Sequence, residues 1–123
     1  MKSRILVVDD NEFMLSMMSH ILSNQGYEVE TLSRAAGLFE CIDTYQPMLI
    51  ILDAQLPDGD GRDLCSIIKQ SKSFHNINVV ICSGIAELED CYKQPGPPDA
   101  VLCKPFDIDQ LLNLVDNSLP RAA

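Results

Sequence analysis

The chain alternates five times between a short apolar run and a segment with the periodicity of an amphipathic helix. The apolar runs cover residues 5–8, 27–32, 48–52, 77–82 and 100–103. The first, third and fourth runs are continuous and rich in Val, Ile and Leu, which is typical of strands buried on both faces of a sheet. The second run alternates apolar and acidic residues, which favours a strand nearer the edge.

The first two helical segments have recognisable start and stop signals. Asn11 is a favourable N-cap for the first, and Gly26 is well suited to end it. Ser33 can cap the second, which must stop before Pro47. The residues that we expect to face the core in these two helices are Met14, Met17, Met18, Ile21 and Leu22, and then Ala35, Leu38, Phe39 and Ile42.

Three further helices are predicted over residues 62–71, 85–93 and 107–118. The middle one should be short, because Pro95, Pro97 and Pro98 follow it and cannot continue a helix. The residues expected to face inward in the other two are Leu64, Cys65, Ile67 and Ile68, and then Ile108, Leu111, Leu112 and Val115.

This order of elements predicts a doubly wound α/β fold, in which helices cover both faces of a five-stranded parallel sheet. The length of 123 residues suits one domain. We expect that domain to cover residues 1–119, with residues 120–123 as a tail or the start of a linker. In such folds, ligands bind outside the carboxyl ends of the strands.

Polar side chains follow four of the five apolar runs directly. Asp9 and Asp10 follow the first run, and Asp53 follows the third. Ser83 follows the fourth, and Lys104 follows the fifth. Taken singly, each has an ordinary interpretation as a loop acid, a helix N-terminus, a strand-end hydroxyl or a solvated lysine. In a parallel sheet, however, all five would converge on one pocket at one edge.

Carboxylates packed together repel one another, so at least one pKa in this pocket should rise. Mg²⁺ would relieve the conflict, because it prefers oxygen ligands and uses a few carboxylates together with phosphate. The backbone carbonyl of Gln55 could supply a further ligand. Lys104 and Ser83 suit the charge of a phosphate group. Asp53 is therefore the candidate nucleophile, which would form an aspartyl phosphate.

Residues 4–119 resemble the receiver domain of two-component response regulators, which has a flavodoxin-like, CheY-like fold. The resemblance rests on four motifs in order, "VVDD", "ILDAQLPDGDG", "ICSG" and "CKPF". It implies five helices and a parallel sheet with strand order 2-1-3-4-5. It also implies a cis peptide bond between Lys104 and Pro105.

The same resemblance implies a role for each candidate site residue and a class of partner. Asp53 would be the phosphoacceptor and Lys104 and Ser83 would contact the phosphoryl group, while Asp9, Asp10, Asp53 and the Gln55 carbonyl would bind Mg²⁺. The donor would be a phosphohistidine on a sensor histidine kinase or a phosphotransfer protein. The domain would catalyse only its own phosphorylation and dephosphorylation, and would control a fused or separate output domain or partner.

Two features depart from the pattern of this family. Val101 stands three positions before the lysine, where the family usually has an aromatic residue whose rotation reports phosphorylation. The segment "KQPGPPDAV" replaces the Gly-Ala-Asp-Asp run that is common before the last strand. We hypothesise that the face formed by the fourth helix, the fifth strand and the fifth helix differs here, so that the usual phosphorylation-driven dimer need not form.

Composition narrows the function further. The net charge of -9 argues against a domain that binds nucleic acid directly through its phosphates. No apolar run approaches the roughly 18 residues of a membrane span, and the N-terminus lacks the features of a signal peptide. The five cysteines include no C-x-x-C motif, which favours reduced thiols and a cytoplasmic protein.

Other residue patterns have ordinary interpretations. His20 and His75 do not follow a strand, so we interpret them as surface residues. Glu87, Glu89 and Asp90 are interpreted as a solvated helix face.

Two alternative functions remain open at this point. A pseudo-receiver would keep the fold as a protein-interaction module without phosphorylation, and Val101 is compatible with this. A phosphatase of the haloacid-dehalogenase type also uses an aspartyl nucleophile. It would need an acid two residues after the nucleophile, where this chain has Gln55, and usually a cap domain.

Overall fold

All five predicted strands are present in one parallel sheet. The structure is a computed structural model that describes residues 3–84 and 91–119. The strands are β1 (Arg4–Val8), β2 (Glu28–Leu32), β3 (Leu49–Asp53), β6 (Asn78–Ser83) and β7 (Ala100–Cys103). Their spatial order is β2-β1-β3-β6-β7, and every pairing is parallel. This is the predicted order 2-1-3-4-5 and confirms the doubly wound α/β fold.

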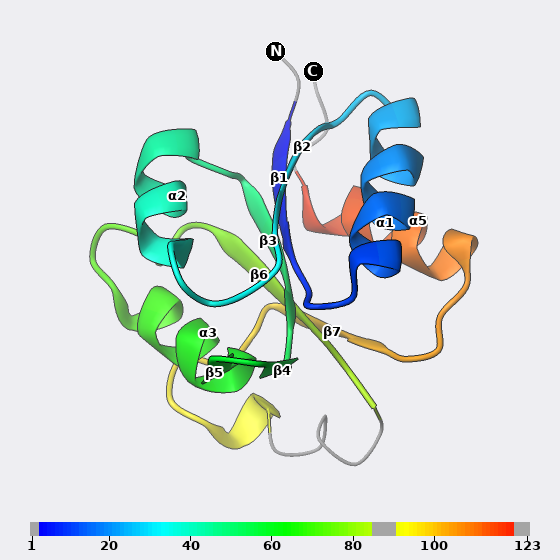
Figure 1. Cartoon of the computed structure of the whole chain (residues 1–123). Coiled ribbons are helices and arrows are strands. Elements are labelled where there is room, and N and C mark those ends of the chain that lie inside the picture. Colours follow the sequence, from blue (N-terminus) through cyan, green and yellow to red (C-terminus); the bar gives the residue numbers. More distant parts are fainter. Residues whose placement is uncertain (1–2, 85–90, 120–123) are drawn as a thin grey trace.

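The helices form two layers on the sheet (Figure 1). Helices α1 (Glu12–Asn24) and α5 (Ile108–Ser118) cover one face, and α2 (Leu38–Tyr45) and α3 (Gly61–Gln70) cover the other. These four are the α-helices within the described residues. The predicted helix over 85–93 lies mostly outside them, as do Glu87, Glu89 and Asp90, whereas Cys91–Lys93 form a short 3-10 helix, η1.

The two helix layers enclose two apolar cores, one on each side of the sheet. Along β1, Ile5 and Val7 belong to the core under α1 and α5, while Leu6 and Val8 belong to the core under α2 and α3. All five residues of β3 are buried. A strand that contributes to both cores must be apolar at every position that faces a core, which explains the continuous runs in the sequence.

Helix α1 begins and ends as the sequence predicts. The side chain of Asn11 accepts a hydrogen bond from the backbone N–H of Met14, at 3.1 Å. At the other end, Gly26 has a φ of 93°, and the N–H of Tyr27 bonds to the carbonyl of Leu22. Of the expected inward-facing residues, Met18 and Leu22 are buried and Met14, Met17 and Ile21 pack against the core; Leu15 is also buried.

Helix α2 begins later than predicted, and Ser33 does not cap it. The helix starts at Leu38 after Gly37, which has a φ of 83° and makes no side-chain cap. The N–H groups of Ala35 and Ala36 instead bond to the carboxylate of Asp58, far along the chain. The cap prediction was wrong because a tertiary contact holds this segment in a loop.

Two predicted core residues are exposed. Ile67 in α3 is 54% exposed and Ile108 in α5 is 52% exposed. In α3 the buried face is defined by Cys65 and Ile68, and Ile67 lies about 100° around the helix from Ile68. Ile108 is the first residue of α5, one turn before the buried Leu111.

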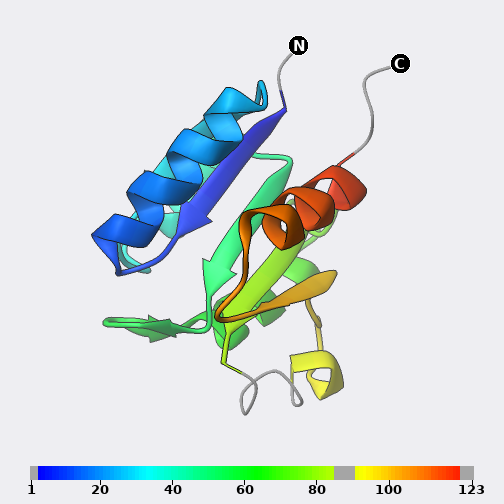
Figure 2. The same ribbon diagram turned by 90° about the vertical axis from the view of Figure 1, so that its right-hand side faces the viewer.

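A short hairpin that the sequence did not predict follows β3. Its strands, β4 (Gln55–Leu56) and β5 (Gly59–Asp60), are antiparallel and lie outside the main sheet. Figure 2 shows it projecting from the carboxyl end of β3. Asp60 then caps α3 by accepting a hydrogen bond from the N–H of Arg62.

The cysteine and histidine side chains differ in their exposure. The cysteines are thiols, of which Cys65, Cys82 and Cys91 are buried. His20 and His75 are exposed, as predicted. In the parts of the chain that the structure covers, no helix combines the length and apolar character needed to cross a bilayer.

The start of α5 provides a test of local stabilisation. Asp107 accepts a hydrogen bond from the N–H of Gln110 at 2.8 Å, and the Gln110 side chain accepts one from the N–H of Asp107 at 2.9 Å. We expect Asp107→Ala to lower the free energy of unfolding by about 1 kcal/mol, measured by urea denaturation. Asn113→Ala, at an exposed position of the same helix, is the control and should change it by less than about 0.5 kcal/mol. Equal effects of the two substitutions would contradict this role.

Candidate functional site

The polar residues predicted at the strand ends lie at one edge of the sheet. Asp9 and Asp10 follow β1, and Asp53 and Ser83 are the last residues of β3 and β6. Lys104 directly follows β7, and β7 pairs with β6. An open depression of about 330 Å³ is lined by Asp10, Asp53, Gln55, Leu56, Pro57, Ser83, Gly84 and Lys104.

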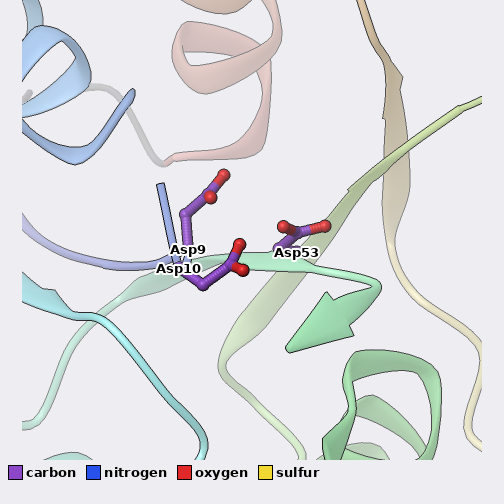
Figure 3. Close-up of side chains that lie close together, drawn as sticks. All are labelled: Asp9, Asp10 and Asp53. Atoms are coloured by element: carbon purple, nitrogen blue, oxygen red, sulfur yellow. The ribbon is translucent and has the colours of Figure 1, made fainter. Parts of the chain in front are cut away.

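Three carboxylates are gathered at this edge (Figure 3). Asp9, Asp10 and Asp53 each offer one oxygen, and these oxygens lie within 4.8 Å of one another. Asp9 is 3% exposed and Asp53 is 7% exposed, whereas Asp10 is open to solvent. Two of the three negative charges are therefore largely removed from water. Their mutual repulsion is stronger in this low-dielectric environment than it would be in water.

Lys104 bridges the two buried carboxylates. Its Nζ lies 3.2 Å from Oδ2 of Asp9 and 3.4 Å from Oδ2 of Asp53. Burial by itself would lower the pKa of Lys104, but the charges of Asp9 and Asp53 outweigh burial and leave the pKa raised. The ammonium group is thus held in its charged form between the carboxylates of Asp9 and Asp53.

Asp53 is in an environment that disfavours its charge. Burial raises the pKa of its carboxyl group, and the charge of Asp9 raises it further. The N–H of Gln55, 3.2 Å from Oδ1, and the ammonium of Lys104 act in the opposite direction, but the pKa of Asp53 remains above its ordinary value. The sequence-based expectation that at least one pKa rises is confirmed.

The two oxygens of Asp9 have separate partners. Oδ1 accepts a hydrogen bond from the N–H of Asn11 at 2.9 Å, just before α1 begins. Oδ2 faces Lys104. The carboxylate therefore connects the start of α1 to the residue after β7, which holds it in place at the pocket.

Ser83 and Gln55 both line the depression. Ser83 is 3% exposed, and its carbonyl accepts a hydrogen bond from the N–H of Lys104 at 2.8 Å. Gln55 lies in the hairpin strand β4.

The bond between Lys104 and Pro105 is cis, as the resemblance implies. Val101 is partly buried and packs against the core under α2 and α3.

The donor set at this edge fits a hard divalent cation. All three side chains offer carboxylate oxygens, which such cations prefer, and the solvent-exposed Asp10 gives access from water. A bound cation would also offset the repulsion that raises the pKa of Asp53.

Gly61 is a residue that the sequence argument overlooked. A Cβ atom at this position would lie 2.0 Å from the carbonyl oxygen of Asp53, and the N–H of Gly61 bonds to the carbonyl of Ala54. Only glycine permits this close approach. The signal was present in "PDGDG", but the sequence cannot show which backbone a glycine touches.

Comparison with known proteins identifies the family. The model of the response regulator receiver domain matches residues 5–116. The chain belongs to this family. The predicted domain boundary at residue 119 lies just beyond the matched region and stays a prediction.

The receiver domain is similar to proteins of very different length. It is 28% identical to sporulation initiation phosphotransferase F of Bacillus subtilis over 123 residues, which are 98% of this chain and 96% of the relative. It is 38% identical over 106 residues to the alkaline phosphatase synthesis transcriptional regulatory protein PhoP of the same species, covering 86% of this chain but 44% of the relative. It also matches adventurous-gliding motility protein Z of Myxococcus xanthus, of which it spans 9%.

Solved structures show the same fold. The receiver domain of NtrX from Brucella abortus is 30% identical, with a TM-score of 0.81 and coverage of 93% of this chain and 96% of that one. A response regulator receiver domain from Bermanella marisrubri is 28% identical, with a TM-score of 0.85 and coverage of 95% and 98%.

Gly61→Ala should disturb both the fold and the site. The added methyl group must displace the Asp53 backbone, so we expect the free energy of unfolding to fall by about 2 kcal/mol or more in urea denaturation. Gly59→Ala is the matched control, because its Cβ would lie 3.3 Å from the Cβ of Ala35 and needs a much smaller adjustment. A cost at Gly61 no larger than that at Gly59 would contradict the close contact.

Asp53→Asn should stabilise the metal-free protein at neutral pH. The folded state holds the pKa of Asp53 above its unfolded value, so the ionised carboxylate lowers stability above that folded pKa. As the pH falls through the folded pKa towards the unfolded value, the wild-type carboxyl takes up a proton and this disadvantage disappears.

Urea denaturation in the presence of a chelator measures this dependence. The stability gain of Asp53→Asn should be present at pH 7 and should shrink as the pH falls towards 4. Asp43→Asn, at an exposed position on α2, is the control. A gain at Asp53 that is constant across this range would be inconsistent with a raised pKa.

Proposed function

We propose that this receiver domain accepts a phosphoryl group on Asp53 from a phosphohistidine donor, with Mg²⁺ bound by Asp9, Asp10 and Asp53. The observation that carries the proposal is the position of Lys104 between the carboxylates of Asp9 and Asp53, beside a three-carboxylate cluster. A cation, a lysine and a hydroxyl around one carboxylate suit the charge of a transferred phosphoryl group. Gln55, through its backbone carbonyl, is the proposed further ligand.

In the transfer step, an oxygen of Asp53 forms a bond to phosphorus while the bond between phosphorus and the donor's imidazole nitrogen breaks. The leaving nitrogen keeps the electron pair. The N–H of Gln55 and the ammonium of Lys104 orient the Asp53 carboxylate before the reaction. When bound, Mg²⁺ would neutralise charge on the carboxylates and on the phosphoryl oxygens.

Lys104 and Ser83 supply positive charge and a hydroxyl donor to the phosphoryl oxygens. Lys104 is held in its charged form by Asp9 and Asp53, so no proton has to be taken up before phosphate arrives. Ser83 is buried at the adjacent strand end, beside the depression that the phosphoryl group would enter. Movement of these two residues towards the new charge would start the conformational change.

The proposed partner is a sensor histidine kinase or a phosphotransfer protein. One relative that this chain covers almost completely is named a phosphotransferase. Others, which are longer than this chain, are named transcriptional regulators. The proposed target of the switch is a fused or separate output domain or a partner protein. The only chemistry proposed for the domain itself is its own phosphorylation and later hydrolysis of the acyl phosphate. A cytoplasmic location is proposed because reduced thiols suit that compartment.

A pseudo-receiver is the second candidate function, and Val101 is the observation that favours it. Valine has no aromatic ring to rotate on phosphorylation, so the usual readout on this side of the sheet has no direct equivalent at this position. The binding module would keep the fold without accepting phosphate.

Phosphorylation can be measured directly by intact-protein mass spectrometry after incubation with Mg²⁺ and acetyl phosphate. We expect the wild type to gain one phosphoryl group and Asp53→Asn to gain none, because the amide lacks the nucleophilic carboxylate. Asp43→Asn is the control and should react as the wild type does. Beryllofluoride should likewise bind the wild type and not Asp53→Asn.

The outcomes separate the two candidate functions. A wild type that forms no adduct with either reagent would favour the pseudo-receiver. Rapid turnover of acetyl phosphate with equal rates in wild type and Asp53→Asn would show that another residue carries the chemistry.

A further inference from the structure

The hairpin after Asp53 forms one wall of the site but is too small to be stable by itself. Each of its strands has two residues, joined by the turn Pro57–Asp58. Gln55, Leu56 and Pro57 line the depression beside Asp53. Because an isolated two-stranded hairpin is marginal in water, the shape of this wall must depend on contacts with the rest of the domain.

Asp58 makes such a contact at the tip of the hairpin. Its Oδ1 accepts a hydrogen bond from the N–H of Ala35 at 2.7 Å, and its Oδ2 accepts one from the N–H of Ala36 at 2.9 Å. Both carboxylate oxygens are thus used on two consecutive backbone amides, 22 and 23 residues away in the sequence. Hydrogen bonds to an ionised acceptor are short and strong compared with neutral ones.

These bonds have a different role from helix capping. Helix α2 begins at Leu38 after Gly37, so Ala35 and Ala36 precede the helix and its cap. The bonds fix the loop between β2 and α2 onto the hairpin tip. Gly59 belongs to the same contact, since a Cβ there would lie 3.3 Å from the Cβ of Ala35.

The base of the hairpin is fixed independently of its tip. Gly61 lies directly against the backbone carbonyl of Asp53, and its N–H bonds to the carbonyl of Ala54. Between these two anchors, the N–H of Gln55 donates to Oδ1 of Asp53 at 3.2 Å. Because Gln55 lies between the two anchors, loss of the contact at the tip would release one end of the segment that contains this N–H donor.

We propose that Asp58 is a positioning residue for the reaction at Asp53: by binding the amides of Ala35 and Ala36, it holds the hairpin so that Gln55 and the Asp53 carboxylate keep the geometry needed for Mg²⁺. This inference rests on the function proposed above. The hydrogen bond from Ala35 is the largest cause that lowers the pKa of Asp58, as expected when backbone N–H groups bond to the ionised carboxylate.

The first test needs neither metal nor phosphate. Amide hydrogen exchange, followed by NMR in the metal-free protein, should show faster exchange at Ala35, Ala36 and Gln55 in Asp58→Ala than in the wild type. Asp58→Asn keeps one acceptor oxygen and should have an intermediate effect. Asp43→Ala removes the same charge from an exposed position of α2 and should leave all three amides unchanged.

The second test is titration with Mg²⁺ alone, followed through the amide signal of Gln55. Asp58→Ala should weaken Mg²⁺ binding by about tenfold, as is typical when a residue that orients a metal ligand is removed. Asp58→Asn should fall between this variant and the wild type, and Asp43→Ala should match the wild type. At saturating Mg²⁺, the rate of reaction with acetyl phosphate should recover in Asp58→Ala, because the reacting groups themselves are intact.

The outcomes distinguish this inference from the proposed function. Unchanged exchange at Gln55, or unchanged Mg²⁺ affinity in Asp58→Ala, would overturn the positioning role while leaving phosphorylation of Asp53 unaffected. If the wild type formed no adduct, the proposed function would fail, and the exchange of Gln55 would still decide whether Asp58 holds the hairpin.

Discussion

The site depends on one ammonium group placed between two buried carboxylates. Asp9 and Asp53 lie at the ends of adjacent strands and are both almost fully removed from water. Without Lys104, their repulsion in a low-dielectric environment would be severe. Lys104 compensates only in part, because the pKa of Asp53 is still raised. The remaining excess of negative charge makes the pocket suitable for a divalent cation.

The parallel sheet brings these groups together. Every central strand must be apolar where it passes between the two helix layers, since its two faces belong to two separate cores. Polar side chains can therefore appear only where each strand leaves the cores, and in a parallel sheet those points share one edge. Residues that are 95 positions apart in the chain, Asp9 and Lys104, meet for this reason.

Sequence periodicity predicted the strands well, and helix boundaries and faces less well. The spatial order of the strands was implied by the resemblance to the receiver domain and not by periodicity. The strands were recognisable because burial on both faces leaves a continuous apolar signal. Ser33 was assigned as a cap from a local preference, but Asp58 binds the amides of Ala35 and Ala36 and keeps that segment in a loop. Ile67 and Ile108 fitted the apolar spacing, yet each lies outside the arc of its helix that touches the sheet.

By itself, the sequence determined the alternating α/β order, the buried strands and the identity of the polar residues at their ends. These are local properties, set by apolar pattern and by residue type. Only the tertiary structure decided that Lys104 contacts both Asp9 and Asp53, that Gly61 lies against the Asp53 backbone, and that Asp58 binds the loop before α2. Each of these contacts joins segments distant in sequence or depends on backbone geometry, and residue type alone does not specify such geometry.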